Sequence, residues 1–128
     1  MTRRGTIVIV RLPPPVGSYT ADTVGREQAF TRPAIVVQAH AVPSRGMTVV
    51  VVPGTTKLSA ANLSFGVLVP VSASNGLHAE TVFLPFQIRA IDVSRIVKEI
   101  GTIEVEHLTR MDAVLRDLLG LASSQGSR

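Results

Sequence analysis

The chain has 128 residues, which fits one domain with one hydrophobic core and leaves too little for two. Hydrophobic residues make up 45% of it and the mean hydropathy is +0.34, so the composition favours a packed globule and excludes a disordered chain. A net charge of +4 and a pI of about 10.7 favour a polyanionic partner such as RNA, DNA or an acidic protein tail. The absence of cysteine excludes disulfides and thiolate metal sites.

The basic N-terminus does not look like a targeting or membrane segment. Met1 to Arg4 carries two arginines, but the apolar run that follows, Ile7 to Val10, is too short for a signal-peptide core or a membrane span. We therefore expect one cytoplasmic domain over residues 1–128, with no membrane contact.

The first half of the chain is predicted to form short apolar strands separated by polar loops. The expected strands cover residues 5–12, 34–39 and 47–52. Pro13-Pro14-Pro15 ends the first strand, and the stretch from Pro13 to Thr31 has little apolar periodicity, which is typical of a long functional or mobile loop. A turn is expected over 42–46, and Pro53-Gly54 ends the third strand before a second polar loop over 55–64.

The second half of the chain is predicted to add further strands, after which its apolar residues take helical spacing. Two strands are expected over 65–70 and 81–86, and the turn between them, 72–78, contains Asn75-Gly76, a strong hairpin signal. A short element near 93–95 leads to a further strand near 99–102.

From Val105 the apolar residues recur at helical spacing. They are Leu108, Met111, Leu115, Leu118 and Leu119. Gly120 stands where a C-cap belongs, and Glu104 and Glu106 near the start complement the helix dipole. This predicts an amphipathic helix of about four turns, followed by a frayed tail over about 121–128. Many short strands with one terminal helix predict a mainly β fold, either a small twisted sheet or a partly open barrel.

Arg32-Pro33 joins the long loop to the second strand. Pro33 has no N–H and suits the first residue of a strand, and it biases Arg32 toward an extended backbone. An arginine at the end of a rigid strand matches phosphate oxygens with its fork of donors. The alternative is an arginine that pairs with a nearby carboxylate, and for Arg-Pro alone that structural role has the higher prior.

An ordered set of short segments is the most specific signal in the chain. The segments are Arg4-Gly5, Pro15-Val16-Gly17-Ser18, Glu27-Gln28, Arg32-Pro33, Val36-Val37-Gln38, Val51-Val52-Pro53-Gly54-Thr55-Thr56, Gln87-Ile88-Arg89-Ala90-Ile91-Asp92, Arg95, Ile100-Gly101, and the helix through Met111, Asp112 and Leu115. With this set, the chain resembles the MazF/PemK/Kid family of toxin endoribonucleases of type II toxin–antitoxin systems. The resemblance implies an SH3-like small barrel with a C-terminal helix (the MazF/CcdB-type fold) and a homodimer.

Three features depart from the family pattern. Thr6 replaces an acidic residue, and Gly54 stands where a bulkier apolar residue is usual. Residues 19–24 look inserted into the first loop, which bears on how that loop closes over RNA.

The resemblance also implies a chemistry. The ribose 2′-hydroxyl attacks the adjacent phosphate and leaves a 2′,3′-cyclic phosphate and a 5′-hydroxyl, without a metal or another cofactor. Arg32 matches the catalytic arginine and Thr55 the catalytic threonine, which would stabilise the charge on the phosphate oxygens. An arginine stays protonated and is a poor base, so its predicted role is electrostatic. On residues alone, the favoured interpretation of Thr55 would be a turn threonine bonded to its own backbone.

Further residues are candidates for contact with single-stranded RNA. They are Glu27, Gln28, Thr56, Lys57 and Gln87. Each could instead be a solvated loop side chain. Arg89 and Asp92 are expected to form a structural ion pair.

The three histidines have no metal-ligand spacing and no catalytic partner in the sequence, so a histidine-based mechanism is not expected; they are His40, His78 and His107. His107 is expected to be exposed on the helix.

The implied partners are single-stranded RNA, a second copy of the chain, and an antitoxin whose acidic tail crosses the basic groove. DNA would be contacted only through the antitoxin. Two other functions stay open: a gyrase-poisoning toxin like CcdB, which depends on a C-terminal tryptophan that this chain lacks, and a dimer that binds RNA without cutting it.

Overall fold

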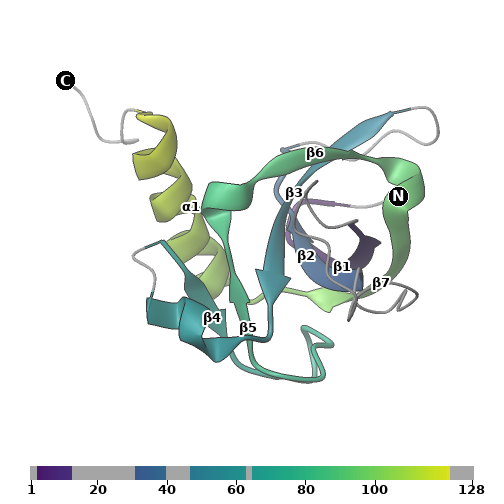
Figure 1. Ribbon diagram of the computed structural model, residues 1–128, viewed down its shortest axis with the longest axis horizontal. Helices are drawn as coiled ribbons and strands as arrows, with labels where there is room; N and C mark the ends of the chain where they lie inside the picture. Colours follow the sequence, from purple (N-terminus) through teal and green to yellow (C-terminus); the bar gives the residue numbers. More distant parts are fainter. Residues whose placement is uncertain (1–2, 13–30, 40–46, 63–64, 122–128) are drawn as a thin grey trace, which may run out of the picture.

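The structure is a computed structural model that describes residues 3–12, 31–39, 47–62 and 65–121. An antiparallel sheet of seven strands runs in the order β4-β5-β3-β2-β1-β7, with β6 paired to β3 (Figure 1). The strands are β1 (Thr6–Arg11), β2 (Thr31–Val36), β3 (Thr48–Thr55), β4 (Val67–Val69), β5 (Thr81–Phe83), β6 (Arg89–Asp92) and β7 (Ile96–Thr102). The helix α1 (Val105–Leu119) ends the described chain, and short 3-10 helices are η2 (Leu58–Asn62), η3 (Pro85–Gln87) and η4 (Val93–Arg95).

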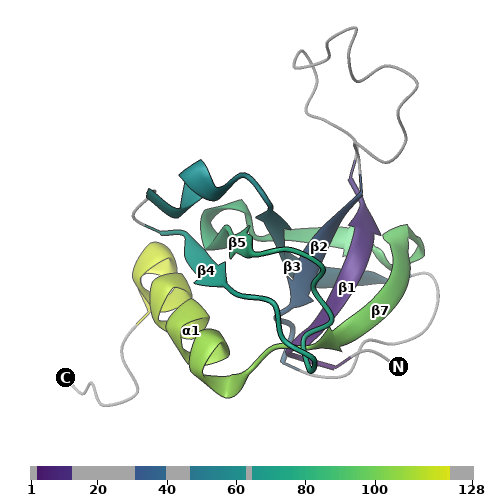
Figure 2. The same ribbon diagram turned by 90° about the horizontal axis from the view of Figure 1, so that it is seen from below.

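The sheet curls into a small barrel that is not fully hydrogen-bonded around its circumference. β7 pairs with β1, β1 with β2, β2 with β3, and β3 with β6. The last gap, between β6 and β7, is bridged along the chain by η4, and the curl is visible in Figure 1. Figure 2 shows α1 beside β4, on the outside of the barrel. The predicted SH3-like small barrel with a C-terminal helix is confirmed.

Both faces of the central strands β1, β2 and β3 are largely buried, which explains why these strands are apolar without alternation. Because successive side chains point to opposite faces, neighbouring residues such as Ile7 and Val8 enter two different cores. One core fills the barrel interior; its buried members are Val8, Val10, Leu12, Ala34, Val36, Val49, Val51 and Ile91. The other lies between the sheet and α1, where Met111 and Leu115 are buried against Ile35 and Phe83.

The helix follows its sequence signals closely. It spans Val105–Leu119, and Gly120 takes the left-handed conformation (φ 68°) that a C-cap requires, with its N–H donating to the carbonyl of Arg116. Arg4 at the start of β1 pairs with Asp112 on the helix and donates to the carbonyl of Val37 (3.2 Å), which ties α1 to the sheet. No helix within the described ranges is long and apolar enough to cross a membrane.

Several strand boundaries differ from the prediction. β2 starts at Thr31, so Pro33 is its third residue and not its first. The mismatch is tolerated because β2 pairs with β3 only from Ala34 onward, which leaves Pro33 with a single neighbouring strand. β3 continues through Pro53 and Gly54 to Thr55 instead of ending before them.

The prediction also missed a strand. Residues 81–86 were expected as one strand, but β5 stops at Phe83, η3 follows, and Arg89–Asp92 forms β6 on the same side of β3. The polar loop over 55–64 contains η2, and the last strand is longer than expected. The predicted turn over 42–46, the loop over 13–30 and the tail beyond Leu121 lie outside the described residues.

The predicted ion pair between Arg89 and Asp92 is wrong. The two residues are three positions apart on one strand, so their side chains leave opposite faces of the sheet. Asp92 instead accepts a hydrogen bond from the backbone N–H of Ser94 (2.8 Å) and starts η4. The hydrogen bonds from Ser94 lower the pKa of the Asp92 carboxyl.

The loop between β4 and β5 is organised by a buried asparagine. Asn75 is fully buried, and its amide group donates to the carbonyl of Pro70 (2.9 Å) and to Glu104 (3.3 Å). Its side-chain oxygen accepts from the backbone N–H groups of Ser72 (3.2 Å) and Leu77 (3.0 Å). All the hydrogen-bonding capacity of the side chain is therefore used to hold the loop in one shape.

Glu104, at the N-cap of α1, also holds this loop. It accepts hydrogen bonds from the hydroxyls of Ser72 and Ser74, besides the one from Asn75. These bonds, led by that of Ser72, lower the pKa of the Glu104 carboxyl from 4.5 to about 2. Glu104 thus acts mainly on the loop and does not cap the helix with its side chain.

We expect Glu104→Gln to lower the free energy of unfolding at neutral pH by about 1–2 kcal/mol, since charge-assisted hydrogen bonds to a partly exposed carboxylate are lost. A carboxyl whose pKa is lowered in the folded state stabilises it above the unfolded pKa. In the parent chain this stabilisation should therefore fade as the pH falls from 4.5 to about 2. Urea titrations across that range measure it, with Glu80→Gln, an exposed carboxylate of the same loop, as the control. Equal acid dependence in all three proteins would contradict the assignment.

Candidate active site

The pairing between β2 and β3 stops before the end of β3, and this opens a depression in the barrel wall. On one edge, β3 pairs with β2 only as far as Pro53, opposite Ala34. On its other edge it pairs with β6 and then, through Gly54 and Thr55, with β5. The start of β2 meanwhile stays on β1, where Thr31 is the last paired residue. The two strand ends therefore separate.

The depression between them, here called the Arg32 pocket, has a volume of about 420 Å³. It is lined by Thr31, Arg32, Pro33, Gly54, Thr55, Thr56, Lys57 and His78. Both residues that the family resemblance assigned to catalysis, Arg32 and Thr55, line this pocket. They would face each other if the β2–β3 register continued for two more residues. Arg32 is exposed and its guanidinium is accessible to a ligand.

Thr55 has the turn hydrogen bond that the sequence analysis gave as the alternative, and its catalytic role stays a prediction. Its Oγ1 accepts a hydrogen bond from the backbone N–H of Lys57 (3.2 Å), as a turn threonine does. A hydroxyl carries one donor beside its acceptor lone pairs. The local bond fixes the oxygen at the pocket, and the hydroxyl hydrogen can still be donated to a phosphate oxygen.

Only some of the other predicted RNA-contact residues line the Arg32 pocket in the described structure. Thr56 and Lys57 follow β3 directly and line the Arg32 pocket. Gln87 is exposed on η3 and is not among the described residues that line it. Glu27 and Gln28 lie outside the described residues. The RNA-contact roles of all five residues stay predictions.

His78 also lines the Arg32 pocket, where the sequence analysis expected no histidine. It is exposed at the end of the loop that Asn75 organises, more than twenty residues from Thr55 in the sequence. Nothing in its local sequence indicates this position, although Asn75-Gly76 marks the turn that carries it. His107 is half-buried on α1 and not exposed as predicted; it does not line this pocket.

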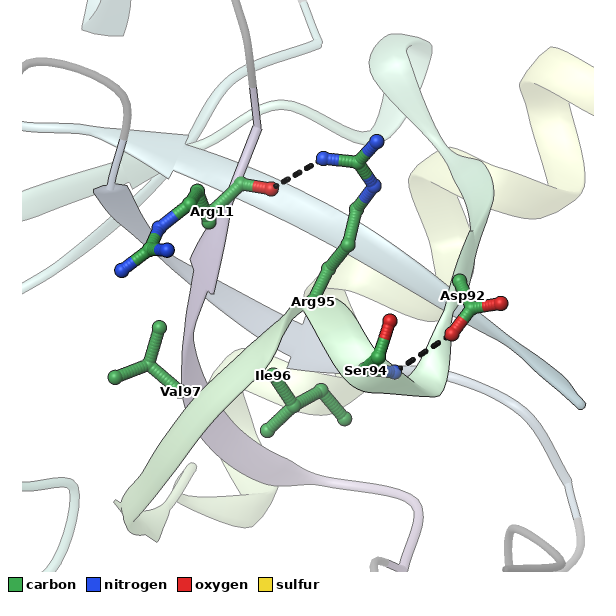
Figure 3. Close-up of a pocket in the computed structure, with 6 residues that line it drawn as sticks. All are labelled: Arg11, Asp92, Ser94, Arg95, Ile96 and Val97. Atoms are coloured by element: carbon green, nitrogen blue, oxygen red, sulfur yellow. Dashed lines mark hydrogen bonds between the residues drawn. The ribbon is translucent and has the colours of Figure 1, made fainter. Parts of the chain in front are cut away.

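A second depression, the Arg11 pocket, lies beside the first at the end of β1. It has a volume of about 580 Å³ and is lined by Arg11, Asp92, Ser94, Arg95, Ile96 and Val97 (Figure 3). In Figure 3 the Arg95 side chain reaches toward β1, where its guanidinium donates to the carbonyl of Arg11 (3.3 Å). Because Arg11 pairs with Thr31 across β1 and β2, the two pockets share one end of the barrel.

The charged side chains of the Arg32 pocket are cationic. Arg32 and Lys57 line it, and the described lining contains no carboxylate. The described ranges also contain no group of three histidine, aspartate or glutamate side chains that could hold a metal ion. The arrangement is suited to bind a phosphate group through a guanidinium, an ammonium and a hydroxyl.

Comparison with known proteins gives the family. Residues 3–119 match the family described as PemK-like, MazF-like toxin of type II toxin–antitoxin system. The chain belongs to this family. A comparison with curated proteins found no match.

Solved structures of MazF proteins share the fold at low sequence identity. MazF from Deinococcus radiodurans superposes with a TM-score of 0.70 at 22% identity, over 94% of this chain and 97% of that one. The Mycobacterium tuberculosis toxin MazF-mt6 gives 0.66 at 20% identity, over 92% and 99%. An endoribonuclease in complex with its cognate antitoxin, from a mycobacterial species, gives 0.60 at 16% identity, over 95% and 96%.

Gly54, the departure from the MazF-like pattern beside Thr55, has a packing reason in this chain. An added Cβ would lie 2.6 Å from the Thr81 methyl and 2.9 Å from the Phe83 ring. These two side chains of β5 occupy the space that a larger residue would need. Gly54 therefore brings β5 close against the end of β3.

We expect Gly54→Ala to cost about 1–3 kcal/mol of stability, because the new methyl group overpacks this contact. Thr81→Ser removes the clashing methyl group and keeps the hydroxyl that donates to the carbonyl of Ala79 (3.0 Å). The double variant should lose less stability than the sum of the two single variants. Urea denaturation of all four proteins measures this, and an unchanged midpoint in Gly54→Ala would show that the contact relaxes freely.

Proposed function

We propose that the protein is a sequence-specific endoribonuclease toxin that cleaves single-stranded RNA without a metal ion. The observation that carries the proposal is the meeting of Arg32 and Thr55 in one cationic pocket. Membership of the MazF-like toxin family supports it.

In the proposed reaction, the ribose 2′-oxygen forms a bond to the adjacent phosphorus, and the bond from phosphorus to the 5′-oxygen of the next nucleotide breaks. The products are a 2′,3′-cyclic phosphate and a 5′-hydroxyl. Negative charge builds up on the non-bridging oxygens in the transition state. Arg32 and the Thr55 hydroxyl bind those oxygens, where fixed donors lower the barrier most effectively.

The surroundings of the pocket support a polyanionic substrate. Lys57 lies beside the reacting phosphate, and Arg11 and Arg95 add positive charge at the same end of the barrel. A strand of RNA crossing both pockets would meet cations in succession, which favours backbone binding. Glu27, Gln28 and Gln87 are the proposed contacts to bases or ribose, together with Thr56.

The proposed partners are a second copy of the chain and an antitoxin. Relatives of the same fold were solved as a MazE-MazF assembly from Deinococcus radiodurans and as an endoribonuclease with its cognate antitoxin. We infer that an acidic antitoxin segment covers the cationic end of the barrel and thereby blocks RNA. The protein would act in the cytoplasm, where its RNA substrate is found, and would meet DNA only through the antitoxin.

The purified protein should cut a long single-stranded transcript in EDTA, leaving 5′-hydroxyl ends.

Arg32→Ala should reduce the rate by about 100-fold or more, the typical loss of one transition-state donor, and should keep the fold because Arg32 is exposed. The matched control is Arg110→Ala, which removes an exposed arginine from α1. Mapping the 5′-hydroxyl ends identifies the RNA sequence that is cut. A folded, antitoxin-free protein that leaves the transcript intact would disprove the nuclease function, and a fully active Arg32→Ala would remove Arg32 from the mechanism.

We also expect a homodimer at micromolar concentration. Light scattering coupled to size exclusion should give twice the mass of the 13.6 kDa chain. A monomeric mass at that concentration would contradict the proposed assembly, while RNA cleavage can be tested independently of it.

A further inference from the structure

The loop that carries His78 is held rigidly. Leu77, the preceding residue, is buried in the core next to α1, and its N–H donates to the buried Asn75 side chain (3.0 Å). Gly76 packs so closely on β7 that an added Cβ would lie 1.9 Å from the carbonyl oxygen of Ile100. His78 is the next residue outward, exposed in the Arg32 pocket. Its position is therefore set by buried groups on both sides of the loop.

The proposed cleavage needs a base that the predicted pair does not supply. The 2′-hydroxyl must lose a proton as its oxygen bonds to phosphorus. Arg32 stays protonated throughout the accessible pH range, and the Thr55 hydroxyl is a donor with no basic character near neutral pH. A histidine side chain titrates near neutral pH and is the usual proton acceptor in such reactions.

We propose that His78 is a catalytic residue that accepts the proton of the attacking 2′-hydroxyl. This inference rests on the proposed nuclease function. As the bond between the 2′-oxygen and phosphorus forms, the neutral imidazole takes the proton, and the electron pair of the breaking bond leaves on the 5′-oxygen. That oxygen takes a proton from solvent water in the open pocket, and the imidazolium then returns its proton to water. Arg32 and Thr55 hold the non-bridging oxygens meanwhile.

The charged groups around His78 are few within the described structure. Arg32 and Lys57 line the pocket with it, from β2 and from the segment after β3. Glu80 follows in the same loop but does not line the pocket, and Glu104 lies beneath the loop in hydrogen bonds to Ser72, Ser74 and Asn75. In the described lining, His78 is the only imidazole, and no carboxylate is present.

The test compares His78→Gln with the parent protein on a short RNA that contains the mapped cleavage site. With enzyme in excess, the cleavage rate of the parent should rise with pH and then level off, as general-base catalysis requires. His78→Gln should be slower by about 100-fold or more and lose that inflection. The matched control, His107→Gln, removes a histidine of α1 that does not line the pocket, and should keep both the rate and the profile.

Two further measurements separate a base from a binding residue or an acid. His78→Gln should change the affinity for the same RNA with a 2′-deoxyribose at the cleavage site by less than about threefold. The loss of a bidentate hydrogen-bonded contact would lower the affinity by more than that. With an RNA whose leaving 5′-oxygen is replaced by sulfur, which needs no proton donor, the defect of His78→Gln should persist.

Four outcomes are decisive. A parent protein that cuts no RNA would disprove the nuclease function and this inference with it. Cleavage by His78→Gln at the parent rate would overturn this inference alone. A loss of affinity that accounts for the whole defect would make His78 a binding residue, and recovery on the sulfur-containing RNA would make it the acid; either result rejects the proposed base.

Discussion

The architecture of this protein depends on one strand that serves three neighbours. β3 pairs with β2 on one edge and with β6 and β5 on the other. The β2 pairing ends at Pro53, whereas the other edge continues into β5, where the carbonyl of Pro53 accepts from Leu84 (2.9 Å). Because β2 remains on β1 at this point, the wall of the barrel opens between two strand ends that are each held firmly from the other side. The candidate active site is that opening.

The close approach of β5 to the end of β3 explains the small residue beside Thr55. Gly54 lets Thr81 and Phe83 approach β3, so that the end of the strand is packed while its next side chain, Thr55, remains half-buried at the pocket. On the other side of the pocket, the buried Asn75 and the carboxylate of Glu104 fix the loop that presents His78. Polar groups of this kind are costly to bury unless they are fully paired, and here the pairing fixes the loop that lines the pocket through His78.

Positively charged side chains gather at one end of the barrel, and the carboxylates with assigned partners stabilise the fold. Arg11, Arg32, Lys57 and Arg95 lie at one end of the barrel. The acidic side chains with assigned partners have structural roles: Glu104 holds the β4–β5 loop, Asp112 of α1 pairs with Arg4, and Asp92, which lines the Arg11 pocket, starts η4. A cationic end without a carboxylate in the described lining of its central pocket suits a phosphodiester.

The sequence by itself determined the helix with its Gly120 cap, the apolar strands, the fold family, and the candidate pair Arg32 and Thr55, because these depend on local periodicity and on short ordered motifs. It did not predict β6, the length of β3, or the separation of Arg89 from Asp92, since strand pairing and the face a side chain takes are decided by contacts between distant segments. It also could not place His78, whose local sequence is that of an ordinary turn. Only the tertiary structure, through the early end of the β2–β3 pairing and the buried Asn75, brings that imidazole to the pocket of Arg32 and Thr55.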